Sequence, residues 1–253
     1  MADALFEERR LARIYDDLDP DRTDLEAYVQ LVDELAARSV LDIGCGTGTF
    51  CCLLAQRGVE VIGVDPAAAS LEVARSKPGA DRVRWLHADA ADLLTIVSDD
   101  WVGVDLVTMT ANVAQVFLTD PHWESVLRAA WIALRPGGHL VFETRDPQRQ
   151  AWLEWTRERS QRQTAVPGVG IVESWVEVTG HDGPKVSFRW TFTFQADGVT
   201  MTSDSTLRFR DRAEIEDSLS QKGFDRVEVR DAVDRPGREF VVLARRPGPD
   251  VPA

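Results

Sequence analysis

The sequence predicts an α/β fold: a doubly wound, mostly parallel sheet that carries an antiparallel β insertion. Strand-like apolar runs alternate with helical patterns five times between residues 39 and 145. A loop with three glycines follows the first run, and alternating polar and apolar runs replace the pattern after residue 170. Strands that alternate with helices form a parallel sheet with helices on both faces and right-handed crossovers. A single domain enlarged by the insertion accounts for the 253 residues.

The charge balance is acidic, with 29 Lys and Arg residues against 42 Asp and Glu residues and a formal net charge of −13. Such a chain binds polyanions poorly, so we expect a small-molecule ligand and neither nucleic acid nor a membrane among its partners. The N-terminus is charged, and no stretch approaches the ~20 apolar residues of a membrane span.

The cysteines and histidines predict neither a disulfide framework nor a metal site. Cys45, Cys51 and Cys52 all fall within eight residues, which indicates a reducing compartment. The four histidines are scattered and lack the spacing of metal ligands. We therefore expect a cytoplasmic protein without a metal.

Residues 1–38 are expected to form helices. A short helical pattern covers residues 5–14, and Asp24 is a suitable N-cap for a second helix that has apolar residues at i, i+3 and i+4. Tyr15 lies between the two helices. It is placed either to close over a ligand or to pack as an aromatic staple at the helix entry, and the sequence leaves both open.

The first strand and the loop after it organise the rest of the chain. Residues 39–43 predict a short buried strand, and Gly44, Gly46 and Gly48 follow it. Glycine permits positive φ and lets a ligand approach the backbone closely. A helix is expected over residues 48–56. Its free N–H groups and the positive end of its dipole favour a carboxylate or a phosphate.

The end of the second strand carries an acid. Residues 59–64 predict a buried strand that ends at Asp65, about 20 positions after Gly44, a separation typical of an acid that binds ribose hydroxyls. Asp65 is also placed to cap the next helix, expected over residues 66–77 with Pro66 at its first position. The two roles are compatible.

Polar residues also follow the third and fourth strands, which are expected over residues 83–86 and 102–109. Asp89 follows the third strand, where it would suit the N-cap of a helix over residues 91–94. Thr110 and Asn112 follow the fourth. An Asn in a loop is often only a turn former, yet ligands of open α/β sheets bind outside the carboxyl ends of the strands.

The parallel pattern ends with a helix and a fifth strand, expected over residues 119–134 and 139–144. A helix over residues 146–163 is predicted next. Three antiparallel strands should follow over residues 171–179, 185–195 and 199–209, joined by the turn sequences HDGP and ADG.

One face of the insertion is aromatic, because Phe188, Trp190, Phe192 and Phe194 recur at period two. We expect this face to pack on the domain, since aromatic side chains dominate cores. Two alternatives stay open: the face could line an apolar acceptor pocket, or it could form a homodimer contact.

A helix from residue 210 to Gly223 and two strands, over residues 224–230 and 239–244, are expected to close the fold and bring the sheet to seven strands. The tail from Arg246 contains three prolines and is expected to be disordered. The predicted parts are helices (1–38), a ligand-binding core (39–145), an insertion that caps it (146–210), closing elements (211–246) and a tail (247–253).

The string Asp42-Ile43-Gly44-Cys45-Gly46-Thr47-Gly48 resembles the first motif of the class I S-adenosylmethionine-dependent methyltransferases. It differs from the dinucleotide fingerprint, because Thr49 stands where the third glycine of Gly-x-Gly-x-x-Gly belongs. Asp65, residues 87–90, Asp105 and the stretch LRPGGHLVFE resemble later landmarks of the family. The resemblance covers about residues 38–145 and extends to the closing helix and hairpin. It implies a Rossmann-like methyltransferase fold with one antiparallel strand in a seven-stranded sheet.

The resemblance also implies S-adenosylmethionine as methyl donor and S-adenosylhomocysteine as product. The glycine loop and Asp42 would hold the methionyl part, Asp65 the ribose, and Asp89 with Ala90 the adenine. The segment after the fourth strand would pass beside the reacting methyl group. The donor-binding residues expected in all are Tyr15, Asp42, Gly44, Cys45, Gly46, Gly48, Thr49, Asp65, Pro66, Asp89, Ala90, Thr110 and Asn112.

The implied activity is methyl transfer by in-line displacement to a nitrogen or oxygen of a small molecule, because a strand-rich insertion after the fifth strand resembles the small-molecule branch of the family. Such an acceptor must lose a proton. Glu143, Arg145, His122 and Tyr15 are candidates for this step, supported only by their position near strand ends. Two other interpretations stay open, namely a noncatalytic S-adenosylmethionine-binding module and a nucleotide-dependent oxidoreductase.

Overall fold

The chain folds around two β-sheets, and the larger contains the predicted strands of the parallel core. Its strands are β1 (Ser39–Ile43), β2 (Glu60–Asp65), β3 (Val83–His87), β4 (Val104–Met109), β5 (Leu134–Arg145), β10 (Asp225–Asp231) and β11 (Glu239–Arg245). In a computed structural model, which describes residues 2–90, 92–96 and 103–248, their order is β10-β11-β5-β4-β1-β2-β3. Ala91 and Val102, where a predicted helix and strand begin, lie outside the described residues.

The pairing confirms a mostly parallel, seven-stranded sheet. β1 pairs in parallel with β2 and β4, β2 with β3, and β4 with β5. β11 is antiparallel to both of its neighbours, β5 and β10. The carboxyl ends of β1 to β5 therefore meet along one edge of the sheet, where a ligand site is expected.

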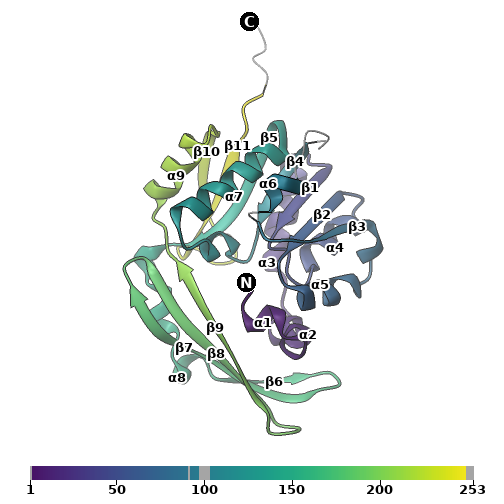
Figure 1. Cartoon of the computed structure of the whole chain (residues 1–253), viewed down its shortest axis with the longest axis vertical. Helices are drawn as coiled ribbons and strands as arrows, with labels where there is room; N and C mark the ends of the chain where they lie inside the picture. The colour runs from purple at the N-terminus through teal and green to yellow at the C-terminus, as the bar shows by residue number, and fades with distance from the viewer. Residues whose placement is uncertain (1, 91, 97–102, 249–253) are drawn as a thin grey trace, which may run out of the picture.

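Helices cover both faces of this sheet (Figure 1). The residues that point to one face pack against helices α6, α7 and α9, and those that point to the other pack against α3 and α4. This burial on both faces explains why the strands appear as nearly continuous apolar runs. The helices are α3 (Asp24–Glu34), α4 (Thr49–Gln56), α5 (Ala68–Arg75), α6 (Leu93–Ile96), α7 (Asp120–Ala133) and α9 (Arg212–Gln221).

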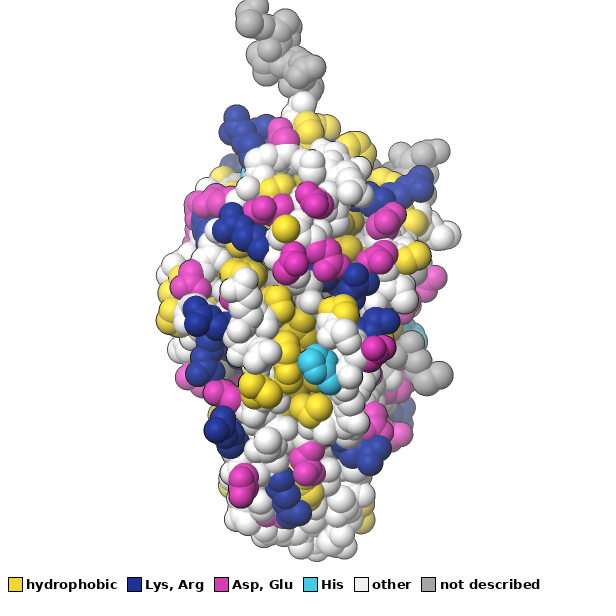
Figure 2. All heavy atoms as spheres, turned by 90° about the vertical axis from the view of Figure 1, so that its left-hand side faces the viewer, with side chains coloured by type: hydrophobic (Ala, Val, Ile, Leu, Met, Phe, Trp, Pro, Cys, Tyr) yellow, Lys and Arg dark blue, Asp and Glu magenta, His cyan; other side chains and the backbone are white. Residues whose placement is uncertain are grey.

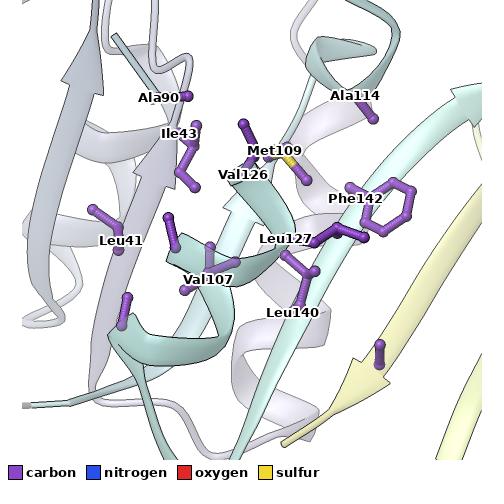
Figure 3. Close-up of a cluster of buried hydrophobic side chains, with 14 of the residues drawn as sticks. Leu41, Ile43, Ala90, Val107, Met109, Ala114, Val126, Leu127, Leu140 and Phe142 are labelled. Carbon is purple, nitrogen blue, oxygen red and sulfur yellow. The ribbon is translucent and has the colours of Figure 1, made fainter. Parts of the chain in front are cut away.

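The core beneath α7 contains most of the large buried side chains. Figure 3 shows Leu41, Val107, Leu140 and Phe142 of neighbouring strands packed beneath Leu127 of this helix. Phe142 has no exposed surface, and the edge of its ring meets Trp123 at a centroid distance of 5.5 Å. These side chains hold β1, β4 and β5 in the register that brings their carboxyl ends together.

The insertion forms the second sheet, but its first part is not the predicted helix. Residues 146–163 contain two 3₁₀ turns, at Pro147–Arg149 and Ala151–Glu154, and the short helix α8 (Arg157–Ser160). Gln150 interrupts them with a φ of 46°, and residue 162 already belongs to a strand that the sequence did not predict. The four strands are β6 (Arg162–Val166), β7 (Gly170–Asp182), β8 (Lys185–Phe194) and β9 (Thr200–Arg208), all antiparallel.

The aromatic face of β8 packs on the rest of the molecule, as expected, and Phe188, Trp190 and Phe192 also line a cavity, as one alternative had it. Phe192 and Phe194 are buried against Leu11 and Ile14 of α2 (Arg9–Leu18), the longer of two N-terminal helices. Figure 1 shows α2 and the shorter α1 (Ala4–Glu7) between the two sheets. The N-terminal helices therefore join the insertion to the core.

Three local predictions are wrong. Thr23, not Asp24, is the N-cap of α3. Pro66 precedes Ala67, the N-cap of α5, so the helix starts later than its proline indicates. The tail is ordered at Arg246, which lies over the ring of Trp131 at 3.8 Å and donates to the carbonyl oxygens that end α7. Residues 249–253, predicted to be disordered, lie outside the described residues.

The face of the molecule in Figure 2 carries both acidic and basic side chains. On that face, acidic and basic side chains of the described residues are interspersed around a band of hydrophobic side chains. No helix within the described residues is long and apolar enough to cross a membrane.

A carboxylate lies inside the sheet. Asp42 sits on β1 between Gly63 and Thr108 of the neighbouring strands and is only 1% exposed. It accepts hydrogen bonds from the Thr108 hydroxyl at 2.7 Å and from the Cys51 thiol at 3.4 Å. Burial raises the pKa of Asp42 to about 6, although both hydrogen bonds act in the opposite direction.

Replacement of Phe142 by alanine should lower the free energy of unfolding by about 3–5 kcal/mol, because it removes a fully buried ring and leaves a cavity between strand and helix. Chemical denaturation measures this loss. Val233→Ala is the matched control, since Val233 is 81% exposed and should change stability by less than about 0.5 kcal/mol. An equal effect of both changes would contradict the packing described for Phe142.

Asp42 should make the protein less stable as the pH rises through its folded pKa. A carboxyl group with a folded pKa of about 6 and an ordinary unfolded pKa binds its proton more tightly in the folded state. Its stabilising contribution is therefore present at about pH 4 and falls by about 2 kcal/mol by about pH 7. Denaturation of wild type and Asp42→Asn across this range tests the difference. A gap between the two proteins that stays constant with pH would contradict the raised pKa.

Candidate functional site

A cavity of ≈ 1150 Å³ lies at the carboxyl ends of β1, β2, β4 and β5. The N-terminal segment with α1 and α2 lines it from one side and strands β8 and β9 from another. Ligand pockets in proteins usually measure about 300–1,000 Å³. This cavity is therefore large enough for a ligand the size of a nucleoside derivative together with a second small molecule.

The three glycines of the loop after β1 have different surroundings. A Cβ on Gly44 would lie 2.7 Å from Val113, and one on Gly48 would lie 2.5 Å from Trp85. A Cβ on Gly46 would meet no described protein atom within 4 Å. All three have positive φ, and only Gly44 and Gly46 line the cavity. Gly44 and Gly48 thus let the loop pack closely, and Gly46 presents bare backbone to open space.

Asp65 connects the loop to the next helix. One carboxylate oxygen accepts from Gly46 N at 2.7 Å and the other from Ala67 N at 2.8 Å. Asp65 is 7% exposed and lines the cavity. Burial raises its pKa, although both backbone hydrogen bonds oppose that shift. The carboxylate therefore positions the loop, and it borders the space that the loop encloses.

Two residues that sequence reasoning missed fasten the loop to α2. Asp16 accepts hydrogen bonds from the hydroxyls of Thr47 at 2.7 Å and Thr49 at 3.3 Å. Lys77 forms an ion pair with Asp16 at 2.6 Å and donates to the Thr49 hydroxyl. The sequence offered no signal for either residue, because Asp16 follows the helical pattern predicted over residues 5–14 and Lys77 ends a predicted helix.

Tyr15 lines the cavity and packs on Phe6, with ring centroids 5.4 Å apart. Burial raises the pKa of its hydroxyl. Tyr15 lies within α2 and not at the entry of a helix, so the staple interpretation is wrong; its ring packs on α1 and borders the cavity.

Asp89 and Ala90 lie beyond the end of β3 and line the cavity. His122 Nε2 is 3.5 Å from an oxygen of Asp89, and the His122 ring meets Phe117 at a centroid distance of 5.0 Å. This part of the cavity is thus bordered by a partly exposed carboxylate, an imidazole and an aromatic ring.

Beyond β4 and β5, the cavity borders a buried polar cluster. Glu143 accepts hydrogen bonds from the hydroxyl of Tyr28 and from Asn112 N, the latter at 3.1 Å. Asn112 Nδ2 donates to Glu239 at 3.2 Å, and Glu239 also pairs with Arg145 at 3.6 Å. Burial raises the pKa of Glu143, and Glu239 adds to the shift by repulsion.

The backbone at this cluster is strained. Ala111 and Asn112 both have positive φ, at 53° and 61°, a conformation that costs free energy for residues other than glycine. The side-chain oxygen of Asn112 is buried and accepts no hydrogen bond from the described residues. Such orphaned acceptors are rare in folded proteins and often mark a functional site.

Most of the residues singled out from sequence come together here. The cavity is lined by the four proton-transfer candidates Glu143, Arg145, His122 and Tyr15, and by every expected donor-binding residue except Gly48. No group of three or more His, Cys, Asp or Glu side chains that could hold a metal ion occurs in the part of the chain that the structure describes.

Known proteins resemble the parallel core of this chain in sequence. Residues 40–138 match a family model described as a methyltransferase domain. The ubiquinone biosynthesis O-methyltransferase of Idiomarina loihiensis is 32% identical over 121 residues, which make up 48% of each chain. The matching part thus spans about half the length of this curated relative.

Two solved structures are similar over nearly the whole chain. An S-adenosylmethionine-dependent methyltransferase from Clostridium acetobutylicum superposes with a TM-score of 0.71, at 18% identity, covering 95% of this chain and 99% of that one. An amino pentose methyltransferase from Micromonospora echinaspora, solved with S-adenosylmethionine bound, has a TM-score of 0.67 at 22% identity, covering 92% and 94%. Residues 40–138 therefore resemble a methyltransferase domain, and the chain has the fold of the S-adenosylmethionine-dependent methyltransferases.

Proposed function

We propose that this protein transfers a methyl group from S-adenosylmethionine to a nitrogen or oxygen of a small molecule, with S-adenosylhomocysteine as the second product. The observation that carries the proposal is the glycine loop after β1. At Gly46 this loop presents backbone without a side chain to a large cavity. The carboxylates of Asp65 and Asp89 border the same cavity.

The residues around the cavity fit the methyl donor part by part. In this proposal, the loop after β1 and Asp42 hold the methionyl part. Asp65 at the end of β2 holds the ribose hydroxyls, and Asp89 with Ala90 after β3 holds the adenine edge. Tyr15, Cys45, Thr49 and Pro66 border the same region. The absence of a side chain at Gly46 provides the close approach that such a ligand needs.

The remaining strand ends are placed for the acceptor. Thr110 and Asn112 after β4, and Glu143 and Arg145 on β5, lie beyond the donor-binding loops and line the same cavity. When bound, S-adenosylmethionine supplies an activated methyl group, so the protein has to align the acceptor and exclude water. The buried polar cluster at Glu143 and the aromatic wall of β8 suit these two tasks.

The parts of the chain divide this work in our proposal. Residues 39–145 bind the donor, and residues 146–210 form a cap that selects the acceptor. Residues 1–38 close the cavity over the glycine loop through Asp16. The amino pentose substrate named for one structural neighbour supports a small-molecule acceptor for this chain as well.

The alanine variant of Asp65 should bind S-adenosylhomocysteine about 10- to 100-fold more weakly, because it loses charge-assisted hydrogen bonds and frees the loop at Gly46. Titration calorimetry of the purified protein measures the change. The same titration with NAD or NADP should show no binding, which separates a methyltransferase from an oxidoreductase.

Glu60→Ala is the matched control, since Glu60 is exposed at the opposite end of β2. It should bind S-adenosylhomocysteine as wild type does. Unchanged affinity in Asp65→Ala would contradict the ribose assignment. A protein that binds the donor but methylates no amine or hydroxyl compound in a broad metabolite screen would indicate a noncatalytic binding module.

A further inference from the structure

The polar cluster beside β5 contains a carboxylate, that of Glu143, that can accept more hydrogen bonds than it receives. Glu143 receives one hydrogen bond on each oxygen, from Tyr28 and Asn112, and a carboxylate can accept about four. Its carboxylate forms no ion pair with any described Lys or Arg. A buried carboxylate without a cation is costly, which suggests that a ligand supplies the missing positive charge.

The orphaned oxygen of Asn112 points to the same kind of ligand. The Asn112 NH₂ group donates to Glu239, and this hydrogen bond assigns the amide orientation. The remaining oxygen is therefore a second buried acceptor, next to Glu143, that receives no hydrogen bond from the described residues. Two neighbouring acceptors are best matched by a group with several N–H donors.

The two neighbouring cations, Arg145 and Arg235, both have other partners. Arg145 lies 3.6 Å from Glu239 and donates to Gln115 at 2.9 Å. Arg235 donates to the same Glu239 at 2.9 Å. Arg235 also lies 3.5 Å from Asp234. The two guanidinium groups therefore face three carboxylates, those of Glu143, Glu239 and Asp234, and one negative charge stays unmatched.

An aromatic wall continues from this cluster. Arg145, two residues after Glu143 on the same face of β5, lies over the ring of Trp155 at 5.7 Å, and Trp155 packs on Phe188 at 4.7 Å. Phe188, Trp190 and Phe192 line the cavity. Aromatic faces attract cations and pack on the carbon skeleton of a ligand.

We infer that the acceptor is a protonated amine on a ring-sized apolar skeleton, with its nitrogen held by Glu143 and the side-chain oxygen of Asn112. This inference rests on the proposed methyltransferase function. A hydroxyl acceptor would bring only one donor to these acceptors and no charge for Glu143. Glu143 is then a catalytic residue, because its carboxylate takes the proton that the amine must lose.

The proton and electron transfers balance without a further reagent. The ammonium group gives one proton to the Glu143 carboxylate, which leaves a neutral amine and a neutral carboxylic acid. A buried site favours two neutral groups over two charges. The nitrogen lone pair forms a bond to the methyl carbon as the carbon–sulfur bond breaks and its electron pair goes to sulfur. The product is a methylated ammonium ion, and Glu143 returns its proton to solvent.

Besides Arg145 of its own strand, which attracts its charge, the titratable and charged groups that face Glu143 come from α3, β11 and the loop before β11. Tyr28 of α3 donates to it, Glu239 of β11 and Asp234 of the loop before β11 repel its charge, and Arg235 of that loop attracts it. Burial is the largest influence and raises the pKa of Glu143. The shift favours a carboxyl group that can hold a proton during the reaction.

Matched pairs of compounds test the inference on the protein loaded with S-adenosylhomocysteine. Benzylamine should bind about 10- to 100-fold more tightly than benzyl alcohol, and cyclohexylamine more tightly than cyclohexanol, because one charge-assisted hydrogen bond is worth that factor. Glu143→Gln should remove the preference while it leaves the affinity for S-adenosylhomocysteine unchanged. Titration calorimetry measures all of these affinities.

Two control variants separate charge from packing. Tyr28→Phe removes the hydroxyl that donates to Glu143 but keeps the carboxylate, so it should keep the preference for amines. Glu60→Gln changes an exposed acid outside the cavity in the same way as Glu143→Gln, and it should behave as wild type.

Equal affinities for amine and alcohol in the wild type would overturn the inference. A preference for the amine that persists in Glu143→Gln would overturn it as well. So would a failure of both amines to bind at millimolar concentration. In these cases the methyltransferase proposal would stand, because S-adenosylhomocysteine still binds. If S-adenosylhomocysteine itself fails to bind the wild-type protein, both proposals fail.

Discussion

The hydrogen bond from the backbone N–H of Gly46 to the carboxylate of Asp65 holds the site together. The bond joins the loop after β1 to the end of β2, and the second oxygen of Asp65 reaches the start of α5. Gly44 N and Cys45 N both donate to Val64 O, so the backbone of β2 supports the loop as well. A loop with three positive φ angles has no secondary structure of its own to hold it, and these bonds provide that support.

The N-terminal helix α2 turns an open sheet edge into a cavity. Its polar side reaches the glycine loop through Asp16, and its apolar side packs on the aromatic face of β8 through Leu11 and Ile14. Arg10 adds a contact over the ring of Phe194, at 3.6 Å. One amphipathic helix therefore links the donor-binding loop to the cap that borders the acceptor. A displacement of α2 would alter both halves of the site together.

Much of the fold could be predicted because its signals are local. A run of apolar residues that ends at Asp65, or a glycine cluster after β1, reports its conformation through neighbours a few residues away. The failed prediction of a helix over residues 146–163 has the converse cause. Its composition suits a helix, but Trp152 packs on Phe209 and Trp155 on Phe188. Contacts with residues far along the chain override a weak local propensity.

The sequence by itself determined the alternation of strands and helices, the glycine loop and the acids at the strand ends, because each depends on residues close together in the chain. Only the tertiary structure decided that Glu143 meets Tyr28 across 115 positions, that Asn112 meets Glu239 across 127, and that Asp16 reaches Thr47. These contacts depend on which strands pair and on where α2 docks. Burial then sets the charge and the hydrogen bonding of each group, and no local pattern in the sequence records that environment.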